Sequence, residues 1–325
     1  MDIVWLIIGL VLILFGADWL TDGASAIAKK WGLSDLTIGL TIVAFGTSAP
    51  ELSISLISAF KGSAPIAVGN VVGSNIFNVF MIIGLVSIIR PIKIEHSVLN
   101  TQIPFVILAS IALLAMGGAN WLGSTSPLLI TRTDGILLLL FFIIFMRYTF
   151  SQAKDASPSD PVAQLGESKP TMPLWKGILL ILIGFGGLIW GGDRFVAGAS
   201  GIASSLGMSD AMIGLTIVAA GSSLPELAAS VASAIKGKPG IAVGNVIGSN
   251  IFNIFLVLGV TSTVLPLPFG DIGISDLLIM TAAAFLFWFL GREFGHRVIN
   301  RWEGGFLVSC YVAYILYNVF LMASS

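Results

Sequence analysis

The stretch from Gly39 to Gly84 reads GLTIVAFGTSAPELSISLISAFKGSAPIAVGNVVGSNIFNVFMIIG. A second copy begins 175 positions later, from Gly214 to Gly259, and reads GLTIVAAGSSLPELAASVASAIKGKPGIAVGNVIGSNIFNIFLVLG. The two copies align without a gap and are identical at 30 of 46 positions. Each copy places one glutamate, Glu51 or Glu226, directly after a proline in an apolar run. The repeat therefore indicates two related halves, each of which supplies one carboxylate.

The composition predicts an all-α polytopic membrane protein. Only 10% of the 325 residues are charged and 56% are hydrophobic, whereas soluble domains have about 25% charged residues. The lipid bilayer is therefore the expected surrounding. The net charge of -1 gives no reason to expect a nucleic-acid partner, and no obligate protein partner is evident. The sole cysteine, Cys310, excludes an intrachain disulfide and a cysteine-based metal cluster.

Ten segments are long and apolar enough to cross a bilayer core of about 30 Å, which takes about 20 helical residues. They are 3–28, 34–60, 65–89, 98–119, 128–149, 174–203, 209–235, 240–265, 272–291 and 304–322. Because each half has five spans, the second half would enter the membrane upside down relative to the first. Such inverted repeats are typical of secondary transporters.

The basic residues are distributed unequally over the two sides of this topology. Thirteen of the 16 lysines and arginines fall on one side, Lys61 and Arg132 fall on the other, and Arg194 lies within the sixth span. Basic residues accumulate in cytoplasmic loops, so we expect both termini to lie outside a cytoplasmic (inner) membrane. The expected division is an N-terminal repeat over 1–150, a cytoplasmic linker over 151–173 and a C-terminal repeat over 174–325.

The second span carries an oxygen-rich break. Pro50 lacks an N–H and disrupts the helix before it, which predicts free backbone carbonyls near Ala44 to Thr47. A free carbonyl in hydrocarbon costs several kcal/mol unless something satisfies it, and a bound cation would do so. The hydroxyls of Thr47 and Ser48 lie beside the Glu51 carboxylate in sequence. Hard cations such as Ca²⁺ and Na⁺ prefer all-oxygen ligands of this kind.

The seventh span repeats this pattern, and the third and eighth spans add amide and hydroxyl oxygens. Ser222, Ser223 and Glu226 are the repeated residues of the seventh span. Ser74 and Asn78 are four residues apart and share one helix face. The eighth span repeats them as Ser249 and Asn253. A glutamate in the middle of a membrane is expensive and marks a functional site by default.

Further repeated residues have structural interpretations. The glycines at 69, 73 and 84, with their counterparts at 244, 248 and 259, are predicted to let neighbouring helices approach closely. Asp18 recurs as Asp193, and the glycines and threonines beside the two suggest either a water-filled cavity or a polar interface.

The motifs GTSAPE, GSSLPE, GNVVGSNIFN and GNVIGSNIFN resemble the two alpha-repeats of the sodium/calcium exchanger family, in its prokaryotic branch. The resemblance covers essentially the whole chain. It implies a ten-helix fold of inverted halves that couples Na⁺ entry to Ca²⁺ extrusion by alternating access, with the first and sixth helices sliding across the bundle. No cofactor is implied, and the transported ions would be Ca²⁺ and Na⁺. The cation ligands that the resemblance implies are Glu51, Glu226, Thr47, Ser48, Ser222, Ser223, Ser74, Asn78, Ser249 and Asn253, with the backbone carbonyls of Ala44 and Ala219.

One position departs from the family pattern. Several members have aspartate where this chain has Asn253, so two carboxylates remain here. Two carboxylates balance one Ca²⁺ or two Na⁺, and a third Na⁺ would leave one uncompensated charge, so the family's usual three-to-one coupling does not follow from this donor set. The proton-coupled branch commonly has an acid shortly after the Gly-Asn pair, where this chain has valine and isoleucine. That difference favours sodium coupling.

Other functions remain as alternatives at this point. A Ca²⁺/H⁺ or other cation/H⁺ antiporter would use the two glutamates as titrating groups. A passive channel could also be built from inverted repeats with broken helices. An enzyme is not expected, because HExxH, GxSxG and Walker A motifs are all missing from the sequence.

Overall fold

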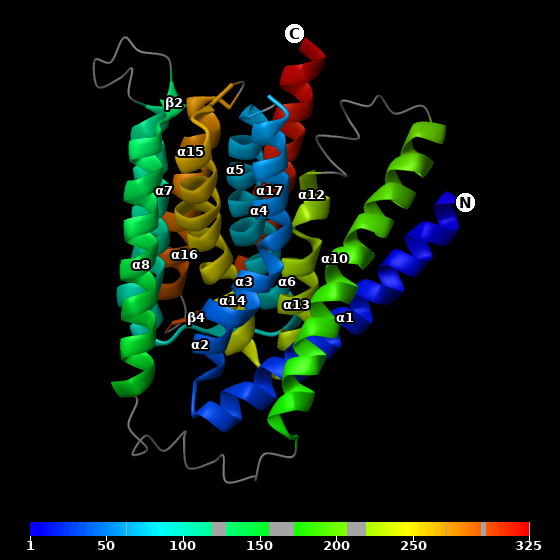
Figure 1. Cartoon of the computed structure of the whole chain (residues 1–325), viewed down its shortest axis with the longest axis vertical. Coiled ribbons are helices and arrows are strands. Elements are labelled where there is room, and N and C mark those ends of the chain that lie inside the picture. Colours follow the sequence, from blue (N-terminus) through cyan, green and yellow to red (C-terminus); the bar gives the residue numbers. More distant parts are fainter. Residues whose placement is uncertain are drawn as a thin grey trace.

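The chain folds into a bundle of long helices (Figure 1). This computed structural model describes residues 1–62, 64–118, 128–155, 172–206, 219–270, 272–293 and 297–324. Within these ranges, nine helical segments are long and apolar enough to cross a membrane.

The elements of the N-terminal half follow the expected spans closely. They are α1 (Asp2–Trp31), α2 (Asp35–Ile38), η1 (Gly39–Val43), α3 (Ala44–Thr47), α4 (Ala49–Phe60), α5 (Pro65–Phe77), η2 (Asn78–Ile83), α6 (Gly84–Ile89), β1 (Ile92–Lys93), η3 (Val98–Gln102), α7 (Ile103–Gly117), β2 (Leu129–Ile130) and α8 (Arg132–Asp155), where η denotes a π-helical segment. Consecutive short helices such as α2, η1, α3 and α4 continue one another and together form one span.

The C-terminal half repeats much of this order, although its described residues include no π-helical segment that corresponds to η3. Its elements are α10 (Leu174–Ser205), α12 (Ala219–Ser222), α13 (Leu224–Ile235), α14 (Pro239–Ile251), η6 (Phe252–Leu258), α15 (Gly259–Val264), β3 (Leu267–Pro268), α16 (Ile274–Glu293), β4 (Val298–Ile299) and α17 (Arg301–Ser324). The expected span 209–235 lies partly outside the described residues, so the count of ten stays a prediction. Most of the expected linker 151–173 also lies outside them.

Two helices stand beside the remaining bundle. In Figure 1, α1 and α10 run side by side in opposite directions and are tilted against the upright helices. Small residues allow this approach: a side chain at Gly9 would collide with the backbone of Phe195, and one at Gly184 with the backbone of Leu20. Gly184 is the repeat counterpart of Gly9, and Leu20 is the repeat counterpart of Phe195, each 175 positions away. The interface is therefore pseudo-symmetric.

The site-bearing spans are interrupted where the prolines predict it. The helical hydrogen bonding changes at Ser48 (φ −83°, ψ 3°), between α3 and α4, and Pro50 lies in the first turn of α4. Ser223 (φ −92°, ψ 7°) separates α12 from α13 in the same way, with Pro225 following. A proline is tolerated in the first turn because its missing N–H would have no partner there.

The third and eighth spans are interrupted by π-helical turns. The segment η2 begins at Asn78, and η6 contains Asn253 at its second position. Such turns are rare and frequently occur at functional sites. They lie at equivalent places of the two repeats.

Two short antiparallel ladders join the halves. Ile92 and Lys93 of β1 pair with Ile299 and Val298 of β4. Strand β2 pairs with β3 in the same manner. Each ladder thus takes one strand from each half.

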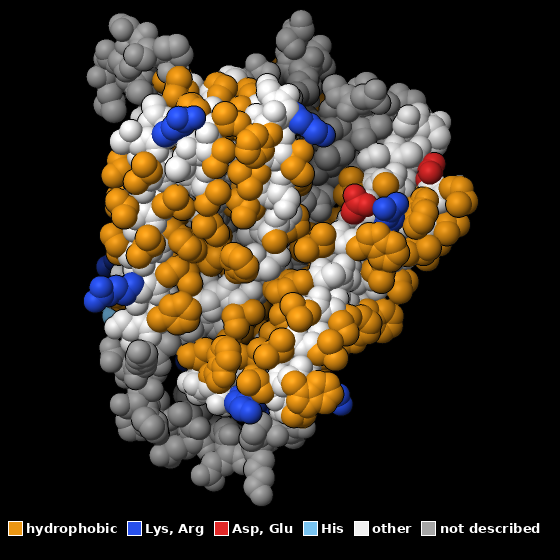
Figure 2. All heavy atoms as spheres, viewed as in Figure 1, with side chains coloured by type: hydrophobic (Ala, Val, Ile, Leu, Met, Phe, Trp, Pro, Cys, Tyr) orange, Lys and Arg blue, Asp and Glu red, His pale blue; other side chains and the backbone are white. Residues whose placement is uncertain are grey.

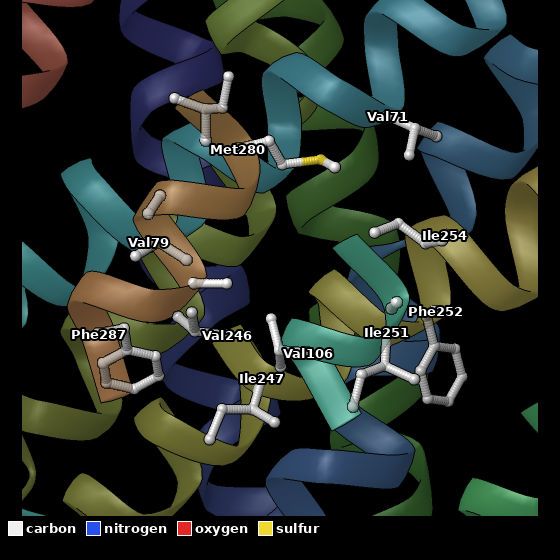
Figure 3. Packing of buried hydrophobic residues seen from close by; sticks show 14 of the residues in the cluster. Val71, Val79, Val106, Val246, Ile247, Ile251, Phe252, Ile254, Met280 and Phe287 are labelled. Carbon is white, nitrogen blue, oxygen red and sulfur yellow. The ribbon is translucent and has the colours of Figure 1, made fainter. Parts of the chain in front are cut away.

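The core contains residues from both halves. One buried hydrophobic cluster contains Val71 and Val79 of the N-terminal half together with Val246, Ile247 and Ile251 of the C-terminal half (Figure 3). Helix α14 and the segments that continue it form the most enclosed span. Hydrophobic side chains cover most of the described face in Figure 2, as a lipid-facing surface requires.

The predicted role of the glycines is confirmed at some positions and wrong at one. Gly244 packs against the backbone of Leu36 and Leu40, and Gly84 packs against Gly304. Around Gly73, however, no atom of the described part of the chain lies within 4 Å of where a Cβ would be. The prediction failed there because sequence spacing cannot tell which face of a helix meets a neighbour.

Candidate cation-binding site

The two repeated glutamates occupy the first turns of α4 and α13. Both are almost completely buried, Glu51 at 0% and Glu226 at 1% exposure. They lie close enough for their charges to interact. The first turn of a helix presents free N–H groups and a positive dipole end, which favours a carboxylate. The break in each span therefore creates a helix terminus that suits an acidic side chain.

Hydroxyls of the first repeat reach into the second repeat. The Ser48 hydroxyl donates to Glu226 Oε1 over 3.4 Å. Thr47 Oγ1 donates to Asn245 Oδ1 over 3.1 Å and lies 3.5 Å from the Ser249 hydroxyl. The second and eighth spans thus contribute polar atoms to one buried region.

Hydroxyls of the second repeat make related contacts with the first. Ser222 Oγ donates to Asn70 Oδ1 over 3.1 Å, which is the counterpart of the Thr47–Asn245 contact. Ser223 Oγ donates to Ser74 Oγ over 3.0 Å. The third and seventh spans therefore meet as well, and all the predicted hydroxyl residues lie in this region.

The two asparagines at the π-helical turns contact the opposite half. Asn78 Nδ2 donates to Asn250 Oδ1 over 3.1 Å, and Asn253 Nδ2 donates to Asn75 Oδ1 over 3.2 Å. All four amides are buried. Asn78 and Asn253 thereby use their donor ends, which leaves their Oδ1 atoms without a donor.

Five acceptor oxygens of this region are buried and accept no hydrogen bond from the described residues. They are Glu51 Oε1, Glu51 Oε2, Glu226 Oε2, Asn78 Oδ1 and Asn253 Oδ1. Leaving such groups unsatisfied costs free energy, and most of all for an ionised carboxylate. A bound cation would satisfy oxygens of this kind.

The two backbone carbonyls predicted as ligands differ from the five oxygens above, because the Ala44 carbonyl already accepts a hydrogen bond. The Ala44 carbonyl accepts the Ser48 N–H over 3.0 Å, so it is not freed by Pro50 in the way the sequence suggested. A carbonyl oxygen has a second lone pair, which leaves it able to bind a cation. Ala219 is the first residue of α12. The role of both carbonyls stays a prediction.

Comparisons with known proteins cover nearly the whole chain. The family model described as "Sodium/calcium exchanger protein" matches residues 1–151 and 176–320.

This chain belongs to the sodium/calcium exchanger family.

Individual members of this family match the exchanger from end to end. A putative antiporter, CaxA, of Alkalimonas amylolytica is 38% identical over 318 residues, which are 96% of each chain. The sodium/calcium exchanger MaX1 of Methanosarcina acetivorans is 32% identical over 342 residues, again 96% of each. The solved sodium-calcium exchanger NCX_Mj, soaked with Na⁺ and Ca²⁺, superimposes with a TM-score of 0.80 at 30% identity, over 97% of both chains.

Four buried or half-buried asparagines of the exchanger site were not among the predicted ligands. They are Asn70, Asn75, Asn245 and Asn250. Asn70 and Asn245 lie four residues before Ser74 and Ser249, so the same face rule would have found them. Asn75 and Asn250 lie off that face, and no spacing rule indicates them.

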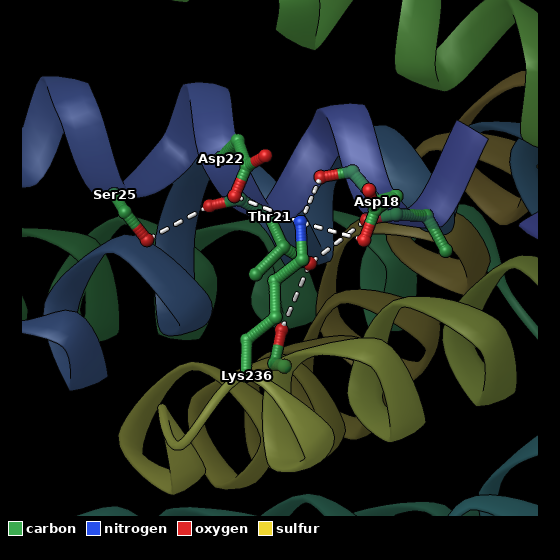
Figure 4. A network of polar contacts seen from close by, with 7 residues as sticks. Asp18, Thr21, Asp22, Ser25 and Lys236 are labelled. Carbon is green, nitrogen blue, oxygen red and sulfur yellow. Dashed lines mark hydrogen bonds and ion pairs between the residues drawn. The ribbon is translucent and has the colours of Figure 1, made fainter. Parts of the chain in front are cut away.

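The aspartates that recur between the halves have different surroundings in the exchanger. Lys236 Nζ lies 2.6 Å from Asp18 Oδ1 and 2.8 Å from Asp22 Oδ1, so α13 is bound to α1 (Figure 4). Asp193 is largely exposed and lies 3.4 Å from Arg194. A polar interface is thus confirmed for Asp18.

Proposed function

We propose that this exchanger moves Ca²⁺ against Na⁺ across the membrane by alternating access. Membership of the family supports this, as does the end-to-end similarity to a sodium-calcium exchanger that was soaked with these ions. The observation that carries the proposal most directly is the group of five buried acceptor oxygens that receive no hydrogen bond from the described residues.

The chemistry of the donor set suits these ions. The described residues hold no group of three or more histidine, cysteine, aspartate or glutamate side chains that could bind a metal. The site instead offers two carboxylates with hydroxyl and amide oxygens, which hard cations prefer. Na⁺ and Ca²⁺ would compete for the same oxygens, and two bare carboxylates would resist closure of an empty site because of their desolvation cost.

Several finer features belong to this proposal. The ligands would be the two glutamates, the six hydroxyl residues, Asn78, Asn253 and the two carbonyls named above. The two halves would be inverted repeats, which the antiparallel course of α1 and α10 supports. The preponderance of basic residues on one side supports outward termini in a cytoplasmic membrane.

Na⁺-gradient-driven Ca²⁺ uptake into proteoliposomes tests the function. Glu51→Gln and Glu226→Gln each remove one of the two charges that balance Ca²⁺, so each should lower the uptake by on the order of 100-fold or more. Glu95→Gln, at an exposed carboxylate, is the matched control and should transport like the wild type. Wild-type activity in both site variants would contradict the site assignment.

The same preparation separates the alternatives. Uptake driven by a pH gradient without Na⁺ would identify a cation/H⁺ antiporter instead. Ca²⁺ entry with no counter-ion on the far side would identify a channel. Strict dependence on the Na⁺ gradient is the result expected here.

A further inference from the structure

Four buried amides cross between the halves in a regular pattern. Asn75 and Asn78 come from the third span, and Asn250 and Asn253 come from the eighth. Asn78 donates to Asn250, and Asn253 donates to Asn75, over 3.1 and 3.2 Å. The pattern is unchanged when each residue is replaced by its repeat counterpart, so both halves supply one donor and one acceptor.

The direction of these hydrogen bonds decides what the amides present to the site. An amide side chain has a donor end and an acceptor end on opposite sides. Because Asn75 and Asn250 accept through Oδ1, Asn78 and Asn253 are held with Nδ2 facing their partners. Their Oδ1 atoms are then buried without a donor. A flipped amide would present an N–H₂ group to a cation, which repels it.

Asn75 is itself fixed from behind. Its Nδ2 donates to the Asn250 carbonyl over 3.3 Å and lies 3.9 Å from Met280 Sδ. Its Oδ1 therefore cannot exchange places with Nδ2 without losing a backbone hydrogen bond. The orientation of the Asn75 amide is in this way fixed by a hydrogen bond from its Nδ2 to the backbone of the other half.

We propose that Asn75 and Asn250 are positioning residues that hold Oδ1 of Asn253 and Asn78 toward the transported cation. This inference rests on the proposed function, since it requires a cation at the site. It assigns a role to two residues that would not touch the ion. Partners of metal ligands in this outer position typically contribute 10–100-fold to metal affinity.

Ca²⁺ titration of the purified protein in detergent is the first test, with Ca²⁺ alone as the probe. Asn75→Leu and Asn250→Leu, which keep the volume and remove the acceptor, should each weaken the Ca²⁺ Kd by roughly 10–100-fold. Asn75→Asp keeps an acceptor oxygen for Asn253 but loses the donor to the Asn250 carbonyl, and it should therefore weaken the Kd less than Asn75→Leu does. Thr261→Val, a buried hydroxyl that bonds only within its own helix, is the control and should leave the Kd unchanged.

Because Asn75 accepts a hydrogen bond from Asn253, double variants give a result that general destabilisation would not produce. Asn75→Leu should weaken the Kd little further in an Asn253→Leu background, because its only effect on the ion passes through Asn253. It should retain its full effect in an Asn78→Leu background. Coupling of this kind is expected for contacting residues, and additivity for independent ones. Equal effects in both backgrounds would overturn the proposal.

The outcomes also separate this inference from the proposed function. If Glu51→Gln abolishes Ca²⁺ binding and Asn75→Leu leaves it intact, only the positioning role is overturned. If the wild type binds no Ca²⁺ at all, the proposed function and this inference both fall.

Discussion

Two asparagines at equivalent sequence positions, Asn70 and Asn245, have different surroundings in the structure. Asn245 is fully buried, accepts from Thr47 and donates to Ser230 and to the Glu226 carbonyl over 3.0 and 3.2 Å. Asn70 is half-buried and accepts from Ser222, and its Nδ2 is without an acceptor among the described residues. Among the described residues, the same amide therefore makes more hydrogen bonds in the second copy of the repeat than in the first.

This difference predicts unequal costs for the same substitution. A hydrogen bond contributes about 1 kcal/mol to stability, so Asn245→Ala should lower the free energy of unfolding by about 2 kcal/mol more than Asn70→Ala does. Chemical unfolding of both variants in the same detergent measures it, and each serves as the other's control. Equal losses would show that the two amides are held alike.

At the residue scale, the candidate ligands were easier to predict than the side chains that contact them. Glu51 and Ser48 were predicted as ligands because a carboxylate and hydroxyls beside a proline in an apolar run have few structural explanations, and the structure buries both. Asn75 was given no role, because its partner lies in the other half. A contact across 178 residues, such as Asn75–Asn253, depends on how the halves pack and leaves no periodic signal in the chain.

At the scale of elements, the crossing of α14 over the second span brings the site together. Gly244 makes this crossing possible, since a Cβ there would lie 2.5 Å from the Leu36 carbonyl and 2.9 Å from Leu40 N. Asn245, which contacts Thr47, is the next residue. The residue at which the two backbones approach closely, Gly244, is therefore directly followed by a residue that contacts Thr47 of the candidate site.

Gly244→Ala should consequently separate these two elements. The substitution overpacks the crossing, which costs about 1–3 kcal/mol, and it should also weaken the Ca²⁺ Kd because Asn245 moves with α14. Gly305→Ala on α17 is the control: nothing lies within 4 Å of a Cβ there, and alanine favours a helix by roughly 0.5–1 kcal/mol over glycine. Thermal unfolding and Ca²⁺ titration of both variants provide the comparison. Wild-type stability in Gly244→Ala would show that the crossing tolerates a methyl group.

The positions of most elements were predictable, whereas their irregularities were not. The span 65–89 ends where the structure ends it, at Ile89, because hydropathy follows directly from the bilayer thickness. The π-helical turns at η2 and η6 have no characteristic amino-acid composition by which they could be predicted. At both turns an asparagine contacts the opposite half, and such contacts between the halves leave no periodic signal in the sequence.

At the scale of the whole molecule, one ion pair is made while its counterpart is not. Lys236 binds Asp18 of α1. The repeat counterpart of Lys236 is Lys61, and that of Asp18 is Asp193, each 175 positions away. Lys61, at the end of α4, makes no ion pair with the described residues. The pseudo-symmetric molecule is thus asymmetric in its charge contacts.

The proposed alternating access would give this asymmetry a meaning, because inverted repeats would exchange conformations when access switches. We expect the Lys236–Asp18 pair to open in the second state and Lys61 to pair with Asp193. An ion pair at a partly exposed position contributes up to about 1 kcal/mol, which is about five-fold in the ratio of the two states.

Lys61→Asp and Asp193→Lys alone should therefore each slow Na⁺-driven Ca²⁺ exchange by a few-fold, since they place like charges together in the second state. The double variant restores an opposite pair and should recover most of the rate, while the Ca²⁺ Kd stays unchanged in all three because neither residue contacts the site. Recovery is the decisive result: a double variant as slow as the slower single variant would mean that Lys61 and Asp193 never meet, and that the two halves do not simply exchange their contacts.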